Sequence, residues 1–174
     1  YVSYLKNSIG VVTCNKIACA SSLKNYNNLK KTARRFVTPF LFETNVGAAL
    51  PIIDTLNNLI ASGDKILEIQ AILSGSLNYI FNNYKLNTTF KNIVQKAQKE
   101  GYTEPDPKID LSGIDVARKI LILGRESGFK LELDDITNNS FLPEEVLKSV
   151  NSDELYESID RNENHFRSIL ENAI

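Results

Sequence analysis

The sequence contains no methionine and no tryptophan, and it has only two cysteines and one histidine among 174 residues. Cys14 and Cys19 are too few for a disulfide framework and favour a reducing compartment, which we take to be the cytoplasm. A single histidine, His165, excludes a metal site built from several imidazoles. Its position in a polar stretch predicts a surface residue. Because the chain lacks methionine and begins at Tyr1, we expect it to be a piece of a longer protein.

The sequence also lacks an excess of either charge and any long apolar run. Lys and Arg number 20 and Asp and Glu number 21, which gives a formal net charge of -1. This balance argues against a strongly basic nucleic-acid binder. No apolar run reaches the roughly 18 residues that a membrane-spanning helix needs. What remains is the composition of one compact domain, or of one domain with a fragment of another.

Alternating strand and helix patterns predict an α/β or α+β fold. Runs of β-branched and other apolar residues predict strands at 10–14, 36–42 and 65–73. The last run is apolar enough to lie in a covered sheet. We expect it to share a sheet with 36–42, with helices on one face, while 10–14 belongs to a different sheet. Segment 131–142 is expected to hold one or two short strands.

Capping residues and apolar spacing predict the helices. The segment after Pro143 is more polar and is also predicted to be mostly helical. The approximate ranges of the other predicted helices are 22–33, 51–62, 75–84, 89–100 and 113–127.

The stretch with the strongest chemical signal is 101–119, GYTEPDPKIDLSGIDVARK. The two prolines that follow Glu104 make 104–107 a rigid acidic turn, and Asp110 and Asp115 follow. Asp115 and Lys119 are four residues apart on an apolar helix, so they share one face. A lysine in that environment can exchange protons near neutral pH and serve acid–base catalysis. An ordinary structural salt bridge accounts for the same pair and stays open as the alternative.

Two further motifs offer groups that could bind a ligand. VTCNK (12–16) ends a predicted strand in small polar residues and Lys16, where open α/β sheets place ligands. Lys16 would meet phosphate or carboxylate there, and its alternative is an ordinary solvated lysine. In ETNVGAALP (43–51), carbonyl groups and Glu43 could bind a hard cation. The alternative for this motif is a tight turn packed under a neighbouring segment.

Together these segments resemble the homoserine dehydrogenase family, and more closely the dehydrogenase part of bifunctional aspartokinase/homoserine dehydrogenases. The stretch ending at Lys119 resembles the family signature, with Lys108 and Ile109 where Arg and Asp are usual. Elsewhere Cys14 replaces a proline and Ala49 replaces a glycine. The resemblance covers about residues 1–145. Its other segments are VTCNK (12–16), TNVGAALP (44–51) and LSGSLNYIF (73–81).

The resemblance implies an NADPH- or NADH-dependent oxidoreductase that reduces L-aspartate 4-semialdehyde to L-homoserine in threonine and methionine biosynthesis. It implies that Lys119 gives a proton to the carbonyl oxygen as hydride arrives, which agrees with the charge that develops there. It also implies substrate binding by Glu104, Asp110 and Asp115. The remaining residues that it implies are Cys14, Lys16 and Gly101 for the cofactor, and Glu43, Val46, Ala48 and Leu50 for a sodium ion.

The same resemblance implies that the chain divides into three parts. Residues 1–40 would be the end of a Rossmann nucleotide-binding domain, and 41–145 a catalytic and dimerisation domain of mixed β-sheet covered by helices. Residues 146–174 would be a polar helical extension. A homodimer and a possible fusion to an aspartokinase are implied as well, with no nucleic-acid or membrane partner.

The sequence contains no G-x-G-x-x-G motif. We therefore expect it to carry the substrate residues but an incomplete cofactor site. Two alternatives stay open: a non-catalytic assembly or dimerisation module derived from such an enzyme, and another aldehyde or keto reductase that uses the same lysine.

Overall fold

The computed structural model describes residues 1–173, of which most are helical: helix makes up 57% of the chain and strand 2%. The chain divides into two compact units. Unit 1 comprises residues 1–73 and 116–137, and unit 2 comprises residues 74–115 and the segment from 138 onward. No helix within residues 1–173 is both long and apolar enough to cross a membrane.

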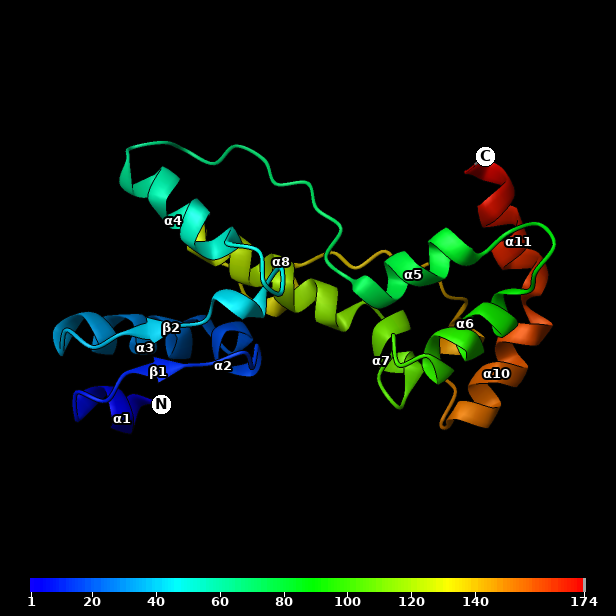
Figure 1. The fold of residues 1–174 in the computed structure, drawn as a ribbon, viewed down its shortest axis with the longest axis horizontal. Helices are drawn as coiled ribbons and strands as arrows, with labels where there is room; N and C mark the ends of the chain where they lie inside the picture. The colour runs from blue at the N-terminus through cyan, green and yellow to red at the C-terminus, as the bar shows by residue number, and fades with distance from the viewer. Residues whose placement is uncertain (174) are drawn as a thin grey trace. The chain divides into compact units, whose positions relative to one another are not determined.

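Unit 1 combines a small parallel sheet with helices. Its strands pair with Val11 opposite Phe40. Leu29, Phe42 and Ile122 belong to one buried apolar cluster that includes residues from the sheet and the helices. The elements of unit 1 (Figure 1) are α1 (Val2–Lys6), β1 (Val11–Val12), α2 (Ile17–Ala20), α3 (Leu23–Arg35), β2 (Phe40–Leu41), a 3₁₀ turn (Glu43–Asn45), α4 (Ile52–Ala61), most of α8 (Ile114–Glu126) and a 3₁₀ turn (Leu133–Asp135).

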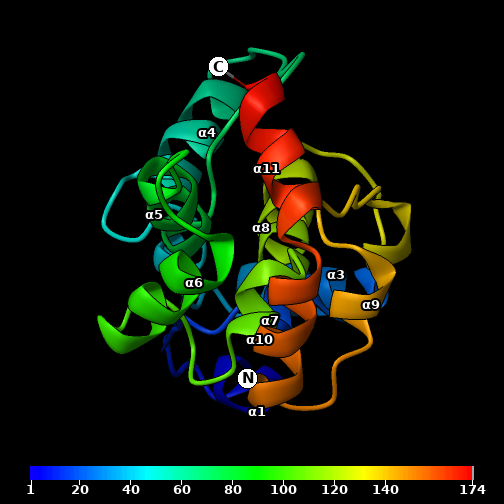
Figure 2. The same ribbon diagram turned by 90° about the vertical axis from the view of Figure 1, so that its right-hand side faces the viewer.

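Unit 2 is helical, and α6 contacts α5, α10 and α11, four helices that are labelled in Figure 2. The ring of Phe90 on α6 stacks on that of Phe166 on α11, with centroids 4.1 Å apart. The Glu163 carboxylate of α11 accepts the backbone N–H of Phe90 at 2.8 Å, which caps α6. The elements are α5 (Gly75–Asn83), α6 (Phe90–Lys99), α7 (Pro107–Leu111), the first residues of α8, α9 (Glu144–Leu147), α10 (Ser152–Arg161) and α11 (Glu163–Asn172).

The predicted helices are confirmed. They could be predicted because the residues that start and end a helix lie close to it in the sequence. The side chains of Ser22, Ser74 and Thr89 each accept a backbone N–H in the first turn of α3, α5 and α6. The helix predicted over 113–127 is α8, and the polar segment after Pro143 forms α9, α10 and α11.

The predicted α/β or α+β fold with a mixed β-sheet is wrong. β1 and β2 lie inside the predicted strands 10–14 and 36–42, but they pair with each other, whereas we expected them in separate sheets. Within the described residues, 65–73 has no regular secondary structure and runs as a drawn-out coil between α4 and α5 (Figure 1), and 131–142 holds only a 3₁₀ turn.

The physical reason for the error at 65–73 is the missing neighbour. A strand-like composition indicates side chains that suit a half-buried pleated surface, and a strand also needs a second backbone to bond to. Ile66, Ile69 and Leu73 of this run pack against the core of unit 1 instead. Leu67 and Ile72 are left 93% and 82% exposed.

Candidate functional site

Lys119 lies on α8, in the part of that helix that belongs to unit 1, and it is half-buried. Its ammonium donates a hydrogen bond to the main-chain carbonyl of Leu73, with Nζ and O 2.6 Å apart. A charged donor on a carbonyl gives a strong bond, so the position of the ammonium is fixed. Asp115 lies one helical turn earlier on α8 and is also half-buried.

Glu104 and Asp110 lie together in unit 2. Asp110 is on α7, and one of its oxygens accepts the backbone N–H of Glu104 at 2.9 Å. The other oxygen accepts the hydroxyl of Ser76 at 2.8 Å. The Glu104 residue is exposed. The acidic stretch leads directly into a helix, because α7 begins at Pro107 with Asp106 as its cap.

Gly101 follows the end of α6 and has a φ of +78°. Glycine adopts this left-handed conformation without the cost that other residues carry. The space where a Cβ would stand is open within 4 Å. The side of the backbone where a side chain would stand is therefore unobstructed by protein atoms.

In unit 1, Asn45 joins two motifs that are far apart in the sequence. Asn45 is 1% exposed, and its amide nitrogen, oriented to satisfy its bonding, donates to the carbonyls of Cys14 at 2.9 Å and Thr13 at 3.2 Å. Cys14 is exposed and Lys16 is half-buried at the start of α2. The VTCNK and TNVGAALP motifs thus meet at one place. No local sequence signal identifies Asn45 as a connecting residue, because the carbonyls that it binds belong to a distant segment of the chain.

The sodium ion expected at Glu43 finds no support. Both oxygens of its carboxylate accept backbone N–H groups at the start of α4, from Ile53 and Asp54, each at 2.8 Å. The carbonyl of Leu50 accepts the N–H of Ile52 at 2.9 Å. In residues 1–173 no group of three or more acidic, histidine or cysteine side chains could hold a metal ion. Glu43 therefore acts as a cap for α4.

The alternative interpretation of this motif, a tight packed turn, fits the geometry. Val46 is buried at 1% exposure. Gly47 has a φ of +84°, and a Cβ there would lie 2.5 Å from a side-chain carbon of Ile52. Ala48 also has a positive φ, of 51°. These residues form the turn that leads into α4, so their sequence is accounted for by backbone conformation and packing.

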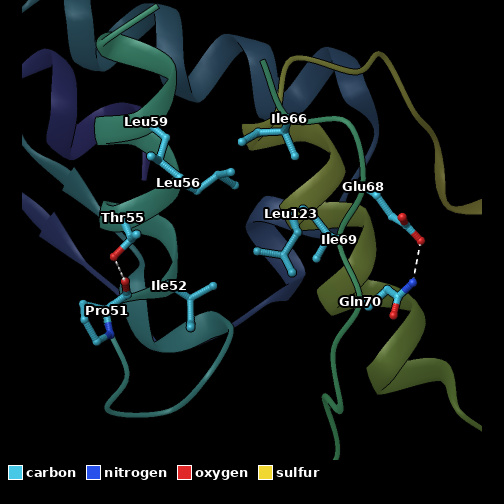
Figure 3. Close-up of a pocket in the computed structure, with 10 residues that line it drawn as sticks. All are labelled: Pro51, Ile52, Thr55, Leu56, Leu59, Ile66, Glu68, Ile69, Gln70 and Leu123. Atoms are coloured by element: carbon cyan, nitrogen blue, oxygen red, sulfur yellow. Dashed lines mark hydrogen bonds between the residues drawn. The ribbon is translucent and has the colours of Figure 1, made fainter. Parts of the chain in front are cut away.

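An apolar groove of about 390 Å³ lies in unit 1 between α4 and the segment 65–73 (Figure 3). Glu68 and Gln70 bond to each other at 2.6 Å, and their side chains point away from α4. None of the candidate catalytic residues lines the groove, so it suits apolar contacts rather than the chemistry considered above. Its apolar walls are formed by Ile52, Leu56, Leu59, Ile66, Ile69 and Leu123.

Buried charges fix the end of α8 to α3. The Glu126 side chain is 1% exposed, and its carboxylate accepts hydrogen bonds from the ammonium of Lys30 at 2.9 and 3.0 Å and from the hydroxyl of Tyr26. Burial, reinforced by the negative charge of Glu126, raises the pKa of Tyr26 above its usual value. The hydroxyl therefore stays protonated and holds its bond to Glu126.

Arg125, beside Glu126, is a second buried anchor. It donates to the carbonyls of Cys19, Ser21 and Leu131 at 2.7–2.9 Å and pairs with Glu132 at 3.0 Å. Burial lowers the pKa of the Arg125 guanidinium. Burial also raises the pKa of the Cys19 thiol to about 12, which keeps it protonated and unreactive at neutral pH. Every group in this cluster has a protein partner, so we assign it a structural role.

The chain is similar to known proteins over most of its length. The family model for homoserine dehydrogenase matches residues 51–171. The chloroplastic bifunctional aspartokinase/homoserine dehydrogenase 1 of Zea mays is 48% identical over 159 residues, which are 91% of this chain and 17% of the maize protein.

The chain is also similar in structure to solved proteins, one of which is a homoserine dehydrogenase. A hyperthermophilic archaeal homoserine dehydrogenase in complex with NADPH aligns with a TM-score of 0.65 and 31% identity, over 73% of this chain and 39% of that one. A Candida auris protein of unknown function aligns with a TM-score of 0.90 and 35% identity, over 99% of this chain and 50% of that one. The chain thus spans between 17% and 50% of the length of these relatives.

Proposed function

The chain belongs to the homoserine dehydrogenase family, and on that basis we propose that it supplies the substrate-binding and catalytic residues of an enzyme that reduces L-aspartate 4-semialdehyde to L-homoserine. The observation that carries the proposal is Lys119. Its ammonium is held on the Leu73 carbonyl at 2.6 Å, one helical turn from Asp115. A fixed ammonium beside a carboxylate is suited to giving a proton to a reacting oxygen.

The proposed chemistry assigns one task to each residue. The nicotinamide cofactor, when bound, supplies the hydride that the aldehyde carbon accepts. Lys119 stabilises the negative charge that develops on the aldehyde oxygen and gives that oxygen its proton. Glu104 and Asp115 bind the ammonium group of the substrate through charge-assisted hydrogen bonds. Asp115 also orients Lys119, its neighbour on α8.

We propose that Cys14, Lys16 and Gly101 lie beside the cofactor. The archaeal relative was solved with NADPH, and the open backbone at Gly101 and the exposed Cys14 suit such a contact. The sequence has no G-x-G-x-x-G, the motif that places a pyrophosphate on a helix N-terminus. These residues would therefore serve the nicotinamide end of the cofactor only.

We expect the isolated 174-residue chain to show no micromolar binding of NADPH in titration calorimetry. The pyrophosphate of a dinucleotide is bound by a glycine-rich loop at a helix N-terminus, and the sequence contains no such motif. The complete enzyme, titrated under the same conditions, is the control and should bind. A micromolar Kd for the isolated chain would contradict the assignment.

We propose a homodimer formed through the segment 65–73. Leu67 and Ile72 are 93% and 82% exposed, and large apolar side chains exposed on one segment favour contact with another protein chain. In light scattering at micromolar concentration we expect the complete enzyme to have the mass of a dimer, and Leu67→Asp to shift it toward the monomer. Val150→Asp is the matched control, because Val150 is 87% exposed in unit 2. A monomeric wild type would refute the dimer.

The relatives bear on the partners and the compartment. The name of the maize protein describes a fusion with an aspartokinase, and such a fusion in the complete enzyme would show as phosphorylation of L-aspartate. We propose a reducing compartment such as the cytoplasm, because two cysteines are too few for a disulfide framework; the maize relative is named as chloroplastic.

The proposed function is tested by substrate comparison in the complete enzyme. NADPH consumption is measured with aspartate 4-semialdehyde and with succinate semialdehyde, which lacks the ammonium group. We expect kcat/KM to be higher for the first by about 10- to 100-fold, the worth of a charged hydrogen bond. Equal values would favour a general aldehyde reductase. Absence of turnover on both substrates would favour an assembly module.

A further inference from the structure

Asp110 occupies the centre of a chain of hydrogen bonds within unit 2. Its Oδ2 accepts the backbone N–H of Glu104 at 2.9 Å, and its Oδ1 accepts the hydroxyl of Ser76 at 2.8 Å. Ser76 is 7% exposed. The Ser76 hydroxyl lies 3.0 Å from that of Ser74, which accepts the N–H of Leu77 and so caps α5.

The chemistry of these groups fixes the direction of every bond. An ionised carboxylate only accepts, so Ser76 gives its one proton to Asp110. Ser74 must then donate its own proton to the oxygen of Ser76, while its oxygen accepts the N–H of Leu77. The cap of a regular helix is thereby connected through two hydroxyls and one carboxylate to the backbone of Glu104.

We propose that Asp110 and Ser76 are positioning residues, which hold the turn that carries Glu104 so that the Glu104 carboxylate meets the substrate ammonium. The inference rests on the proposed function, and it gives Asp110 a different task from the direct substrate contact expected from the family resemblance. Both oxygens of Asp110 already bind protein donors. Glu104, in contrast, is exposed and its backbone is the part that is anchored.

A second contact supports the same reading of the turn. The side-chain amide of Gln98, on α6, donates to the carbonyl of Pro105 at 2.8 Å. The backbone is therefore held on both sides of the peptide that links Glu104 to Pro105. A carboxylate on a turn fixed in this way loses little conformational freedom when the substrate binds.

The substitution Asp110→Asn separates positioning from direct binding. An asparagine has the same shape and can accept the Glu104 N–H with its oxygen while donating to Ser76, whose hydroxyl can rotate. It lacks the charge that a substrate ammonium would need. In the complete enzyme, we expect KM for aspartate 4-semialdehyde to rise about tenfold in Asp110→Ala but less than about threefold in Asp110→Asn, with kcat changing less than KM in both.

Two independent measurements test the same proposal: KM of Ser76 variants and hydrogen exchange of the Glu104 backbone amide. Ser76→Ala should raise KM by about threefold and Ser76→Thr should restore it, since the hydroxyl is the group that matters. In the 174-residue chain, hydrogen exchange of the Glu104 amide should accelerate about tenfold in Asp110→Ala and stay slow in Asp110→Asn.

These experiments distinguish a failure of the positioning role of Asp110 from a failure of the proposed function. Glu104→Gln should raise KM whether or not Asp110 is a positioning residue, so an unchanged KM there overturns the proposed function itself. If Glu104→Gln raises KM and Asp110→Asn is as damaging as Asp110→Ala, Asp110 binds substrate directly and the positioning role is refuted. A Glu104 amide that already exchanges freely in the wild-type chain also refutes it.

Discussion

Replacing Lys119 by alanine is expected to reduce kcat of the complete enzyme by roughly two to four orders of magnitude, the usual contribution of a positioned proton donor. KM for the aldehyde should change much less, because the interaction of the lysine strengthens as charge develops on the oxygen. Steady-state kinetics with aspartate 4-semialdehyde measure both quantities. The bond from Lys119 to the Leu73 carbonyl is lost as well, so the melting temperature is measured on the same variant.

Lys119→Arg is the matched control for charge. A guanidinium keeps the positive charge but stays protonated and points its donors differently, so we expect it not to restore turnover. The structural alternative predicts the reverse pattern. If Lys119 only pairs with groups of the protein, Lys119→Ala will lower the melting temperature with little change in turnover per folded molecule. Lys119→Arg will then be nearly silent.

The helices of this chain could be predicted from sequence because their determinants are local. A capping side chain such as that of Ser22 or Thr89 bonds a backbone group three residues away. The pairing of strands in the sheet could not be predicted, because the composition of a strand does not identify the strand with which it pairs. The run 65–73 has a strand-like composition without a partner among the described residues. The run 10–14 does have a partner strand, which lies in the segment 36–42 that the sequence predicts for a different sheet.

The candidate site divides in the same way. The spacing of Asp115 and Lys119 places both on one helix, and the two prolines after Glu104 predict the turn that leads into α7. The groups that hold these residues could not be anticipated. The Leu73 carbonyl is 46 positions from Lys119, and Ser76 is 34 positions from Asp110. Neither bond has a local sequence signal, because each one depends on tertiary packing.

The largest effect on stability is expected from Arg125, whose side chain is 0% exposed. Arg125→Ala removes the donor to the carbonyls of Cys19, Ser21 and Leu131 and the partner of Glu132. Buried acceptors left without a donor are costly, and so is the space that the side chain vacates. Because the Glu132 side chain is 50% exposed, the cost comes from the vacated space and the carbonyls that lose their donor, and we expect the free energy of unfolding to fall by about 2–5 kcal/mol.

Urea unfolding of the 174-residue chain, followed by circular dichroism, measures this loss. Lys148→Ala is the matched control, because Lys148 pairs with Glu144 at 2.9 Å while both side chains are at least 75% exposed. An exposed pair contributes little, so the midpoint should not move. The urea midpoint of Arg125→Lys should lie between those of Arg125→Ala and Lys148→Ala, since one ammonium cannot bond to all of the acceptors that the guanidinium contacts. If Arg125→Ala and Lys148→Ala unfold at the same urea concentration, the buried cluster does not hold α8 in place.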